Sequence, residues 1–270
     1  MNDSEIYVDI AVKAAKEAGK IHKKYFQGNY KLKTKSASFD LLTSADTEAE
    51  AAVVSLIRKH FPEHNFLAEE NKYPKTDSEY TWVIDPLDGT NNFVCGLPIF
   101  CSSVALVHKG KTLAGVIYDV TRDELFYAQK GKGSFLNGKP IRVNKVNTIK
   151  KALLITGFYY SRGKEVVETL DAVKKFLFQH ILGIRRLGAA ALDLCYVASG
   201  RAAGYWEYEL SPWDFAAGKL IVEEAGGRVS GRHCEELPWD KKYFIVASNG
   251  KIHRLMLAVI NSVGRQKVRA

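Results

Sequence analysis

Two acidic side chains three positions apart follow a short apolar run in the segment 82–93, Trp-Val-Ile-Asp-Pro-Leu-Asp-Gly-Thr-Asn-Asn-Phe. Residues 81–84 predict a buried strand, so Asp85 and Asp88 are expected close together where that strand ends. Two carboxylates this close repel each other unless a proton or a cation lies between them. Hard oxygen ligands of this kind suit Mg²⁺ better than zinc, so the segment predicts a magnesium site.

The residues that follow can bend a chain and hold an anion. Pro86 fixes its own φ and predicts a turn, and Gly89 lets the backbone close on a ligand. Thr90 begins a predicted helical turn whose free N–H groups could hold a phosphate. Turn chemistry alone is equally compatible with a solvated surface turn.

A third carboxylate lies far along the chain in the segment 211–218, Ser-Pro-Trp-Asp-Phe-Ala-Ala-Gly. Asp214 falls in the first turn of a predicted helix that continues to Ala225 and ends at Gly226 and Gly227. The small residues 216–218 let this helix approach another backbone closely, which could bring Asp214 to the first two carboxylates. Taken alone, Asp214 is an ordinary favourable charge at a helix N-terminus.

Together these segments resemble the inositol monophosphatase family, the Mg²⁺-dependent, lithium-sensitive phosphatases of sugars and polyols. The resemblance rests on residues 82–93, on 212–218 with the Glu-Ala-Gly-Gly of 224–227, and on 188–193. It covers nearly the whole chain. It implies an α+β fold, the layered αβαβα sandwich of this family.

The resemblance also implies roles for individual residues, with about two or three Mg²⁺ ions per site. It assigns as metal ligands Glu69, Asp85, Leu87 through its carbonyl oxygen, Asp88 and Asp214. As catalytic residues that activate the attacking water it assigns Asp46, Thr90 and Glu69. Asp46 also suits a helix N-terminus, and Glu69 is also compatible with a solvated position beside Glu70.

Substrate binding is expected to draw on both halves of the chain. The expected contacts are Asp88, Gly89, Thr90, Gly188, Ala190, Glu207 and Asp214. Glu207 matches the acid of the family that binds hydroxyl groups, although an exposed strand residue is the alternative. Arg185 and Arg186 either bind a substrate phosphate or stabilise a subunit interface.

The implied reaction is hydrolysis of a phosphate monoester, with inositol 1-phosphate as the expected substrate, by a water that the metal activates. The alternatives within the family are fructose-1,6-bisphosphatase, histidinol phosphatase and 3′-phosphoadenosine nucleotidase activity. No histidine neighbours the acidic motifs along the sequence, and no Gly-x-Ser-x-Gly elbow is present, so a covalent intermediate is not expected.

Composition favours one globular unit. The chain has 270 residues, of which 46% are hydrophobic, and no linker-like or low-complexity tract. We expect a single unit over 1–270, with a metal-binding half at about 1–145 and a substrate-recognition half at about 146–270. Neither a signal peptide nor a membrane span is evident, so a cytoplasmic protein with reduced cysteines is expected. A homodimer is the expected assembly.

The net charge of +9 raises a non-enzymatic alternative, the binding of nucleic acid or another polyanion. Lysines gather on the first predicted helix, at positions 13, 16, 20, 23 and 24. Lysine runs on helices usually form solvated faces, and no aromatic residues interleave with them. Nucleic acid is therefore not expected as the main partner. The expected main partner is a small phosphorylated polyol or sugar.

Periodicity predicts the elements that carry these residues. Helices are expected at 4–26, 165–178, 189–198 and 215–224. A further helix is expected to begin at a capping box formed by Thr47 and Glu50 and to run to about residue 60. Strands are expected at 102–107, 113–118, 124–128, 152–156, 203–208 and 243–247, with a short one at 66–68 and a hairpin turn at Asn137 and Gly138. Residues 29–42 are expected to include a mobile loop.

Overall fold

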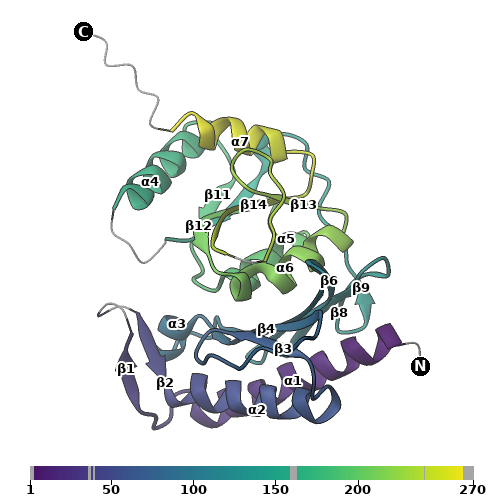
Figure 1. Ribbon diagram of the computed structural model, residues 1–270. Helices are drawn as coiled ribbons and strands as arrows, with labels where there is room; N and C mark the ends of the chain where they lie inside the picture. The colour runs from purple at the N-terminus through teal and green to yellow at the C-terminus, as the bar shows by residue number, and fades with distance from the viewer. Residues whose placement is uncertain (1–2, 36–37, 39, 159–162, 240, 264–270) are drawn as a thin grey trace.

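Helices and sheets alternate as layers in the computed structural model, which describes residues 3–35, 38, 40–158, 163–239 and 241–263. From the bottom of Figure 1 upward, the order is helices, a sheet, helices, a second sheet and helices. This order confirms the predicted αβαβα sandwich.

The first layer consists of α1 (Asp3–Tyr25) and α2 (Ser44–His60), which cover the outer face of the first sheet (Figure 1). Of the apolar face of α1 that helical periodicity predicts, Ile10, Ala14, Ala18 and Ile21 are buried, whereas Ile6 at its start is exposed. These positions recur every three or four residues, which places them on one side of a helix.

The first sheet has seven strands in the order β3-β4-β5-β6-β7-β8-β9. All neighbours are antiparallel except β3 and β4, which are parallel. The strands are β3 (Asn65–Ala68), β4 (Tyr80–Asp88), β5 (Cys101–His108), β6 (Lys111–Asp119), β7 (Glu124–Gln129), β8 (Gly133–Leu136) and β9 (Lys139–Pro140). Asn137 and Gly138 join the last two strands with φ of 48° and 78°, which confirms the predicted hairpin turn.

The second sheet has five strands in the order β11-β10-β12-β14-β13, in which β10 is parallel to both of its neighbours. The strands are β10 (Leu153–Thr156), β11 (Gly183–Arg185), β12 (Gly204–Leu210), β13 (Arg228–Ser230) and β14 (Tyr243–Ser248). The outer face is covered by α4 (Lys164–Leu177) and α7 (His253–Asn261) (Figure 1). A 3₁₀ helix (Ile149–Lys151) precedes β10.

Between the two sheets lie α5 (Ala190–Ala198) and α6 (Pro212–Glu224) (Figure 1). A Cβ placed on Gly115 of β6 would lie 2.8 Å from the carbonyl oxygen of Ala217, and one on Gly218 would lie 2.5 Å from Leu194 Cδ1. The small residues of α6 therefore let its backbone contact the first sheet and α5 closely, as predicted.

The start of α2 differs from the predicted capping box at Thr47 and Glu50. The cap is Thr43, whose Oγ1 accepts from the backbone N–H of Ala45 at 3.1 Å, while Asp46 Oδ2 accepts from the backbone N–H of Thr43 at 2.8 Å. The chain is already helical at Thr47, because this earlier capping box satisfies the free N–H groups of the first turn.

The segment 29–42 is only partly a loop. It contains β1 (Leu32–Thr34), which pairs with β2 (Leu41–Thr43) as an antiparallel hairpin. The remainder of the expected loop, at 36, 37 and 39, lies outside the described residues. All four cysteines are free, as predicted. In the described part of the chain, no helix is both long and apolar enough to span a membrane.

Candidate active site

The acidic segment of β4 lies on an irregularity within the strand. Asp85 pairs with Ser103 of β5, Asp88 pairs with Cys101, and the register shifts between them. The backbone N–H of Leu87 donates to Asp85 Oδ1 at 3.0 Å. Since β4 continues through Pro86 to Asp88, the predicted strand end before Pro86 is wrong. The bulge bends the strand while it keeps both carboxylates on it.

His22 of α1 supports this bulge from behind. The side chain is fully buried, and its Nε2–H donates to the carbonyl oxygen of Pro86 at 2.8 Å. Burial lowers the pKa of His22 to about 4, and the hydrogen bond to Pro86 opposes this only in part, so the ring is neutral at physiological pH. The expectation that no histidine neighbours the acidic motifs holds along the sequence and is wrong in space.

The turn after β4 requires glycine at position 89. Gly89 has a φ of 92°, and a Cβ there would lie 2.8 Å from the carbonyl oxygen of Ile99. Directly behind it, Thr90 begins the short helix α3 (Thr90–Val94), as predicted. The backbone at Gly89 therefore closes tightly beside the two carboxylates.

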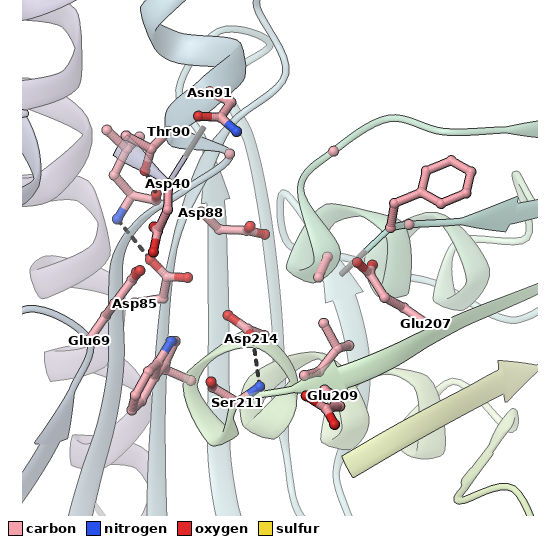
Figure 2. A pocket seen from close by; sticks show the side chains of 18 of the residues that line it. Asp40, Glu69, Asp85, Asp88, Thr90, Asn91, Glu207, Glu209, Ser211 and Asp214 are labelled. Atoms are coloured by element: carbon pink, nitrogen blue, oxygen red, sulfur yellow. Dashed lines mark hydrogen bonds between the residues drawn. The ribbon is translucent and has the colours of Figure 1, made fainter. Parts of the chain in front are cut away.

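Carboxylates from three separate segments face a common cavity of about 290 Å³. Figure 2 shows Glu69 after β3, Asp85 and Asp88 on β4, and Asp214 in the first turn of α6 directed toward the same space. The structure therefore brings these four side chains to one cavity, and their role as metal ligands stays a prediction.

Burial and mutual repulsion make this cluster unfavourable without a cation. Burial raises the pKa of Asp85 and of Asp214 well above its usual range, and the charge of Glu69 raises both further. Burial also raises the pKa of Asp88 to about 7, although the backbone N–H of Ala191 opposes the rise. Charge crowded in this way is relieved by bound protons or by a cation.

Backbone N–H groups and Lys35 donate hydrogen bonds to the four carboxylates. Ala191 N–H donates to Asp88 Oδ2, and Ser211 N–H donates to Asp214 Oδ2, each at 2.7 Å. Lys35 Nζ donates to Glu69 Oε1 at 2.8 Å. Among the described residues, no three Asp, Glu, His or Cys side chains are grouped closely enough to form a ready-made metal site.

The donor set nevertheless fits a hard divalent cation. The cavity is lined by Glu69, Asp85, Asp88 and Asp214 together with Leu87, whose backbone offers a carbonyl oxygen. Carboxylates and carbonyl oxygens are the ligands that Mg²⁺ prefers, and soft ligands such as His would indicate other metals. The ammonium group of Lys35 pairs with Glu69 at 2.8 Å and with Glu70 at 2.6 Å.

Asp46 and Thr90 form a hydrogen-bonded pair at the edge of this cluster. Thr90 Oγ1 lies 2.9 Å from Asp46 Oδ1 and 3.0 Å from the carbonyl oxygen of Leu87. The other oxygen of Asp46 accepts from the backbone N–H and the hydroxyl group of Thr43. Burial raises the pKa of Asp46, partly offset by the hydrogen bonds from Thr43 and Thr90. The pair predicted from the sequence is therefore formed, with Asp46 fixed from both sides.

The opposite side of the cavity is built by the second half of the chain. Gly188, Ala190 and Glu207 line it (Figure 2 labels Glu207). Tyr205 OH donates to Glu207 Oε2 at 2.6 Å, and burial raises the pKa of Glu207 to about 7 although this hydrogen bond opposes the rise. An exposed strand residue, the alternative considered for Glu207, does not fit this position.

Several residues of the site were not anticipated as such. Glu50 of α2 is buried and holds the segment after Glu69, and the cavity is also lined by Asp40, Glu209 and Lys242. No local pattern marks these residues, because each reaches the site only through the packing of distant segments. Both of the arginines left open are exposed; Arg186 lines the cavity, whereas Arg185 ends the edge strand β11 and is not among the lining residues.

Comparisons with known proteins find relatives that match nearly the whole chain. The chain is 42% identical over 256 residues to the Nus factor SuhB of Escherichia coli K12, covering 93% of this chain and 94% of the relative. It is 40% identical over 257 residues to the inositol-1-monophosphatase of a Synechocystis species, covering 94% and 88% of the two chains.

Solved structures of similar proteins have the same fold as this chain. An inositol monophosphatase from Anabaena superposes with a TM-score of 0.85 at 40% identity, covering 96% of each chain. An IMPase/NADP phosphatase in complex with Mg²⁺ and phosphate has a TM-score of 0.85 at 26% identity, covering 98% of this chain and 99% of the other.

A staphylococcal inositol monophosphatase in a lithium chloride inhibitory complex has a TM-score of 0.86 at 26% identity, covering 98% of this chain and 97% of the other. The sequence profile of the inositol monophosphatase family matches residues 3–265. The chain therefore belongs to the inositol monophosphatase family.

Proposed function

We propose that the protein hydrolyses phosphate monoesters with Mg²⁺ as its cofactor and inositol 1-phosphate as its preferred substrate. The observation that carries this proposal is the convergence of Glu69, Asp85, Asp88 and Asp214 on one cavity (Figure 2). A cavity of about 290 Å³ has room for a small polyol phosphate.

Metal binding is assigned to the oxygen ligands of this cavity. The proposed ligands are Glu69, Asp85, the carbonyl oxygen of Leu87, Asp88 and Asp214. When bound, Mg²⁺ would neutralise charge on the phosphoryl group and lower the pKa of the attacking water. Lys35 contacts only Oε1 of Glu69, so Oε2 would be available to the ion.

The attacking water is assigned to Thr90 and Glu69. Thr90 Oγ1 lies within hydrogen-bond distance of Asp46 Oδ1 and of the carbonyl oxygen of Leu87. With its hydrogen donated to Asp46, the oxygen lone pairs of Thr90 would accept a hydrogen bond from the water. Asp46 cannot rotate away, since Thr43 holds its second oxygen. The Asp46–Thr90 pair would thus orient the water and accept its proton as the water oxygen attacks phosphorus.

Substrate recognition is assigned mainly to the second half of the chain. Proposed substrate contacts are Asp88, Gly89, Thr90, Gly188, Ala190, Glu207 and Asp214. Residues from about 1–145 would bind most of the metal, and those from about 146–270 would select the alcohol, although Asp214 contributes to both. A homodimer in the cytoplasm remains our prediction for the assembly and its location.

A panel of phosphate esters tests this function. Purified protein is assayed with Mg²⁺ on inositol 1-phosphate, fructose 1,6-bisphosphate, histidinol phosphate and 3′-phosphoadenosine 5′-phosphate, beside the variant Asp85→Asn. We expect Mg²⁺-dependent release of phosphate, fastest from inositol 1-phosphate, and a loss of at least about a hundredfold in the variant. Turnover that survives in Asp85→Asn would contradict the assigned metal site.

A second candidate function is binding to a polyanion, because the similar Escherichia coli protein is named a Nus factor and the lysines of α1 are exposed. Two of these lysines are already paired, Lys20 with Glu17 and Lys24 with Glu48. A gel shift with RNA at increasing salt concentration tests this candidate. A salt-sensitive shift that Asp85→Asn leaves intact would support a role separate from catalysis.

A further inference from the structure

Strand β12, which carries Glu207, contains one residue more than its partner strand requires. Between Glu207 and Leu210, β12 advances by three residues. The paired residues of β14 advance by only two, from Ile245 to Tyr243. Such a β-bulge bends its strand and redirects the side chains on it. The bulge lies directly before Ser211, where the chain leaves the second sheet for α6.

Glu209 lies in this bulge with a backbone conformation that glutamate disfavours. Its φ is 51°, and the left-handed position of a bulge is usually taken by glycine, which has no Cβ. Six other non-glycine residues in the described part of the chain have a positive φ, and all six lie in turns or bends outside the strands. Backbone strain of this kind gathers at functional sites, so the side chain of Glu209 is a candidate for a role in binding.

The carboxylate of Glu209 is open to a molecule in the cavity. Glu209 and Glu207 both line the cavity, and Figure 2 shows them on the same side of it, across from Glu69. Glu207 already accepts a hydrogen bond from Tyr205 OH. Glu209 is exposed, and no described residue forms a hydrogen bond or an ion pair with its carboxylate. Glu209 therefore lies at the mouth of the cavity, with both oxygens available.

We propose that Glu209 is a specificity residue that accepts hydrogen bonds from hydroxyl groups of the substrate beyond those that contact Glu207. This proposal rests on the proposed phosphatase function and narrows its substrate class to alcohols that carry several hydroxyl groups. A carboxylate accepts through two oxygens and cannot donate, so it favours hydroxyl groups over groups that lack a donor. The bulge would hold the carboxylate at the mouth of the cavity, at the cost of the strained backbone.

The test measures kcat/KM with Mg²⁺ for inositol 1-phosphate and for p-nitrophenyl phosphate, whose alcohol part has no hydroxyl group. We expect Glu209→Gly to lower the ratio of the first value to the second by about fivefold, the scale of one hydrogen bond. Glycine adopts a positive φ without steric cost, so this variant should keep its fold and its Tm. Glu209→Gln keeps one acceptor oxygen and should lower the ratio by less.

His180→Gly is the matched control, because His180 has a φ of 58° and does not line the cavity. It makes the same backbone change and should leave the ratio as in the natural protein.

An unchanged ratio in Glu209→Gly would overturn the proposal. Unchanged rates on both esters would make Glu209 a residue of the bulge alone, and equal losses on both would assign it to the metal site or the fold. Either result leaves the phosphatase function standing. If the natural protein hydrolyses neither ester in the presence of Mg²⁺, the proposed function is wrong and the role of Glu209 falls with it.

Discussion

Glu50 on α2 accepts a hydrogen bond from the backbone N–H of Glu70, with 2.9 Å between Glu50 Oε2 and the nitrogen. Its other oxygen accepts from Asn71 Nδ2 at 2.8 Å and from Tyr73 OH at 2.9 Å. One buried carboxylate thus holds three residues of the segment that directly follows Glu69. The position of Glu69 at the cavity therefore depends on a residue that does not touch the cavity.

We predict that Glu50→Gln raises the Mg²⁺ concentration for half-maximal activity by about tenfold, a typical effect of losing a residue that orients a metal ligand. The amide has one acceptor oxygen, so at least one of the three donors would face its NH₂ group. A Mg²⁺ titration of activity measures the effect, with Glu48→Gln on the same helix as the control. A variant that unfolds at lower temperature but binds Mg²⁺ normally would make Glu50 purely structural.

We predict that Asp88→Asn stabilises the metal-free protein, increasingly as the pH rises. The pKa of Asp88 is raised from an ordinary value of 3.8 to about 7 in the folded state. A raised carboxyl pKa means that folded stability is fully present below the unfolded value and is lost as the pH rises toward the folded value. The difference in Tm between variant and natural protein, measured in EDTA, should therefore grow between these two pH values.

Added Mg²⁺ should reverse the order of the two proteins. The ion binds the folded natural protein and raises its Tm, whereas Asp88→Asn has lost a proposed ligand and should gain much less. Equal stabilisation of both by Mg²⁺ would place the ion away from Asp88.

We predict that lithium inhibits turnover uncompetitively with respect to the substrate. A monovalent ion that replaces Mg²⁺ between Asp88 and Asp214 after the ester bond is broken would hold the product phosphate in the site. Initial rates at several substrate and lithium concentrations test this, with sodium at equal ionic strength as the control. Lithium that competes with the substrate, or that has no effect beyond that of sodium, would contradict the prediction.

We predict that Glu207→Gln lowers kcat/KM for inositol 1-phosphate by about tenfold, the scale of one hydrogen bond to a charged group. The carboxylate of Glu207 suits two adjacent hydroxyl groups, and p-nitrophenyl phosphate offers none, so its hydrolysis should change little. Equal losses on both esters would mean that Glu207 supports the metal site or the fold instead of the hydroxyl groups.

The parts of this site that were predictable from sequence are those specified by short local patterns. An apolar run followed by Asp85 and Asp88, and a helix start at Asp214, each follow from residues within one element. The choice of Thr43 over Thr47 as the cap of α2 was not visible, because both positions fit a capping box. It depends on the hairpin before the helix, where Ser44 N–H donates to the carbonyl oxygen of Lys31 at 3.0 Å.

Contacts between distant segments account for what the sequence did not reveal. His22 and Pro86 are 64 positions apart, and no periodicity links them. Arg185 and Arg186 are chemically identical in the sequence. Arg185 is the last residue of β11 and Arg186 follows the strand, so the path of the chain after β11 decides which of them lines the cavity.

The position of α6 between the two sheets has a consequence for how activity arises during folding. Asp214 is carried by a helix whose backbone packs against Gly115 of the first sheet, while Glu69 and Asp85 come from that sheet itself. A nascent chain that has completed only the first sheet lacks one of the proposed ligands. A bound ion would therefore link α6, which is synthesised late, to the first sheet, which is synthesised early. Catalysis would begin only after α6 had packed against that sheet.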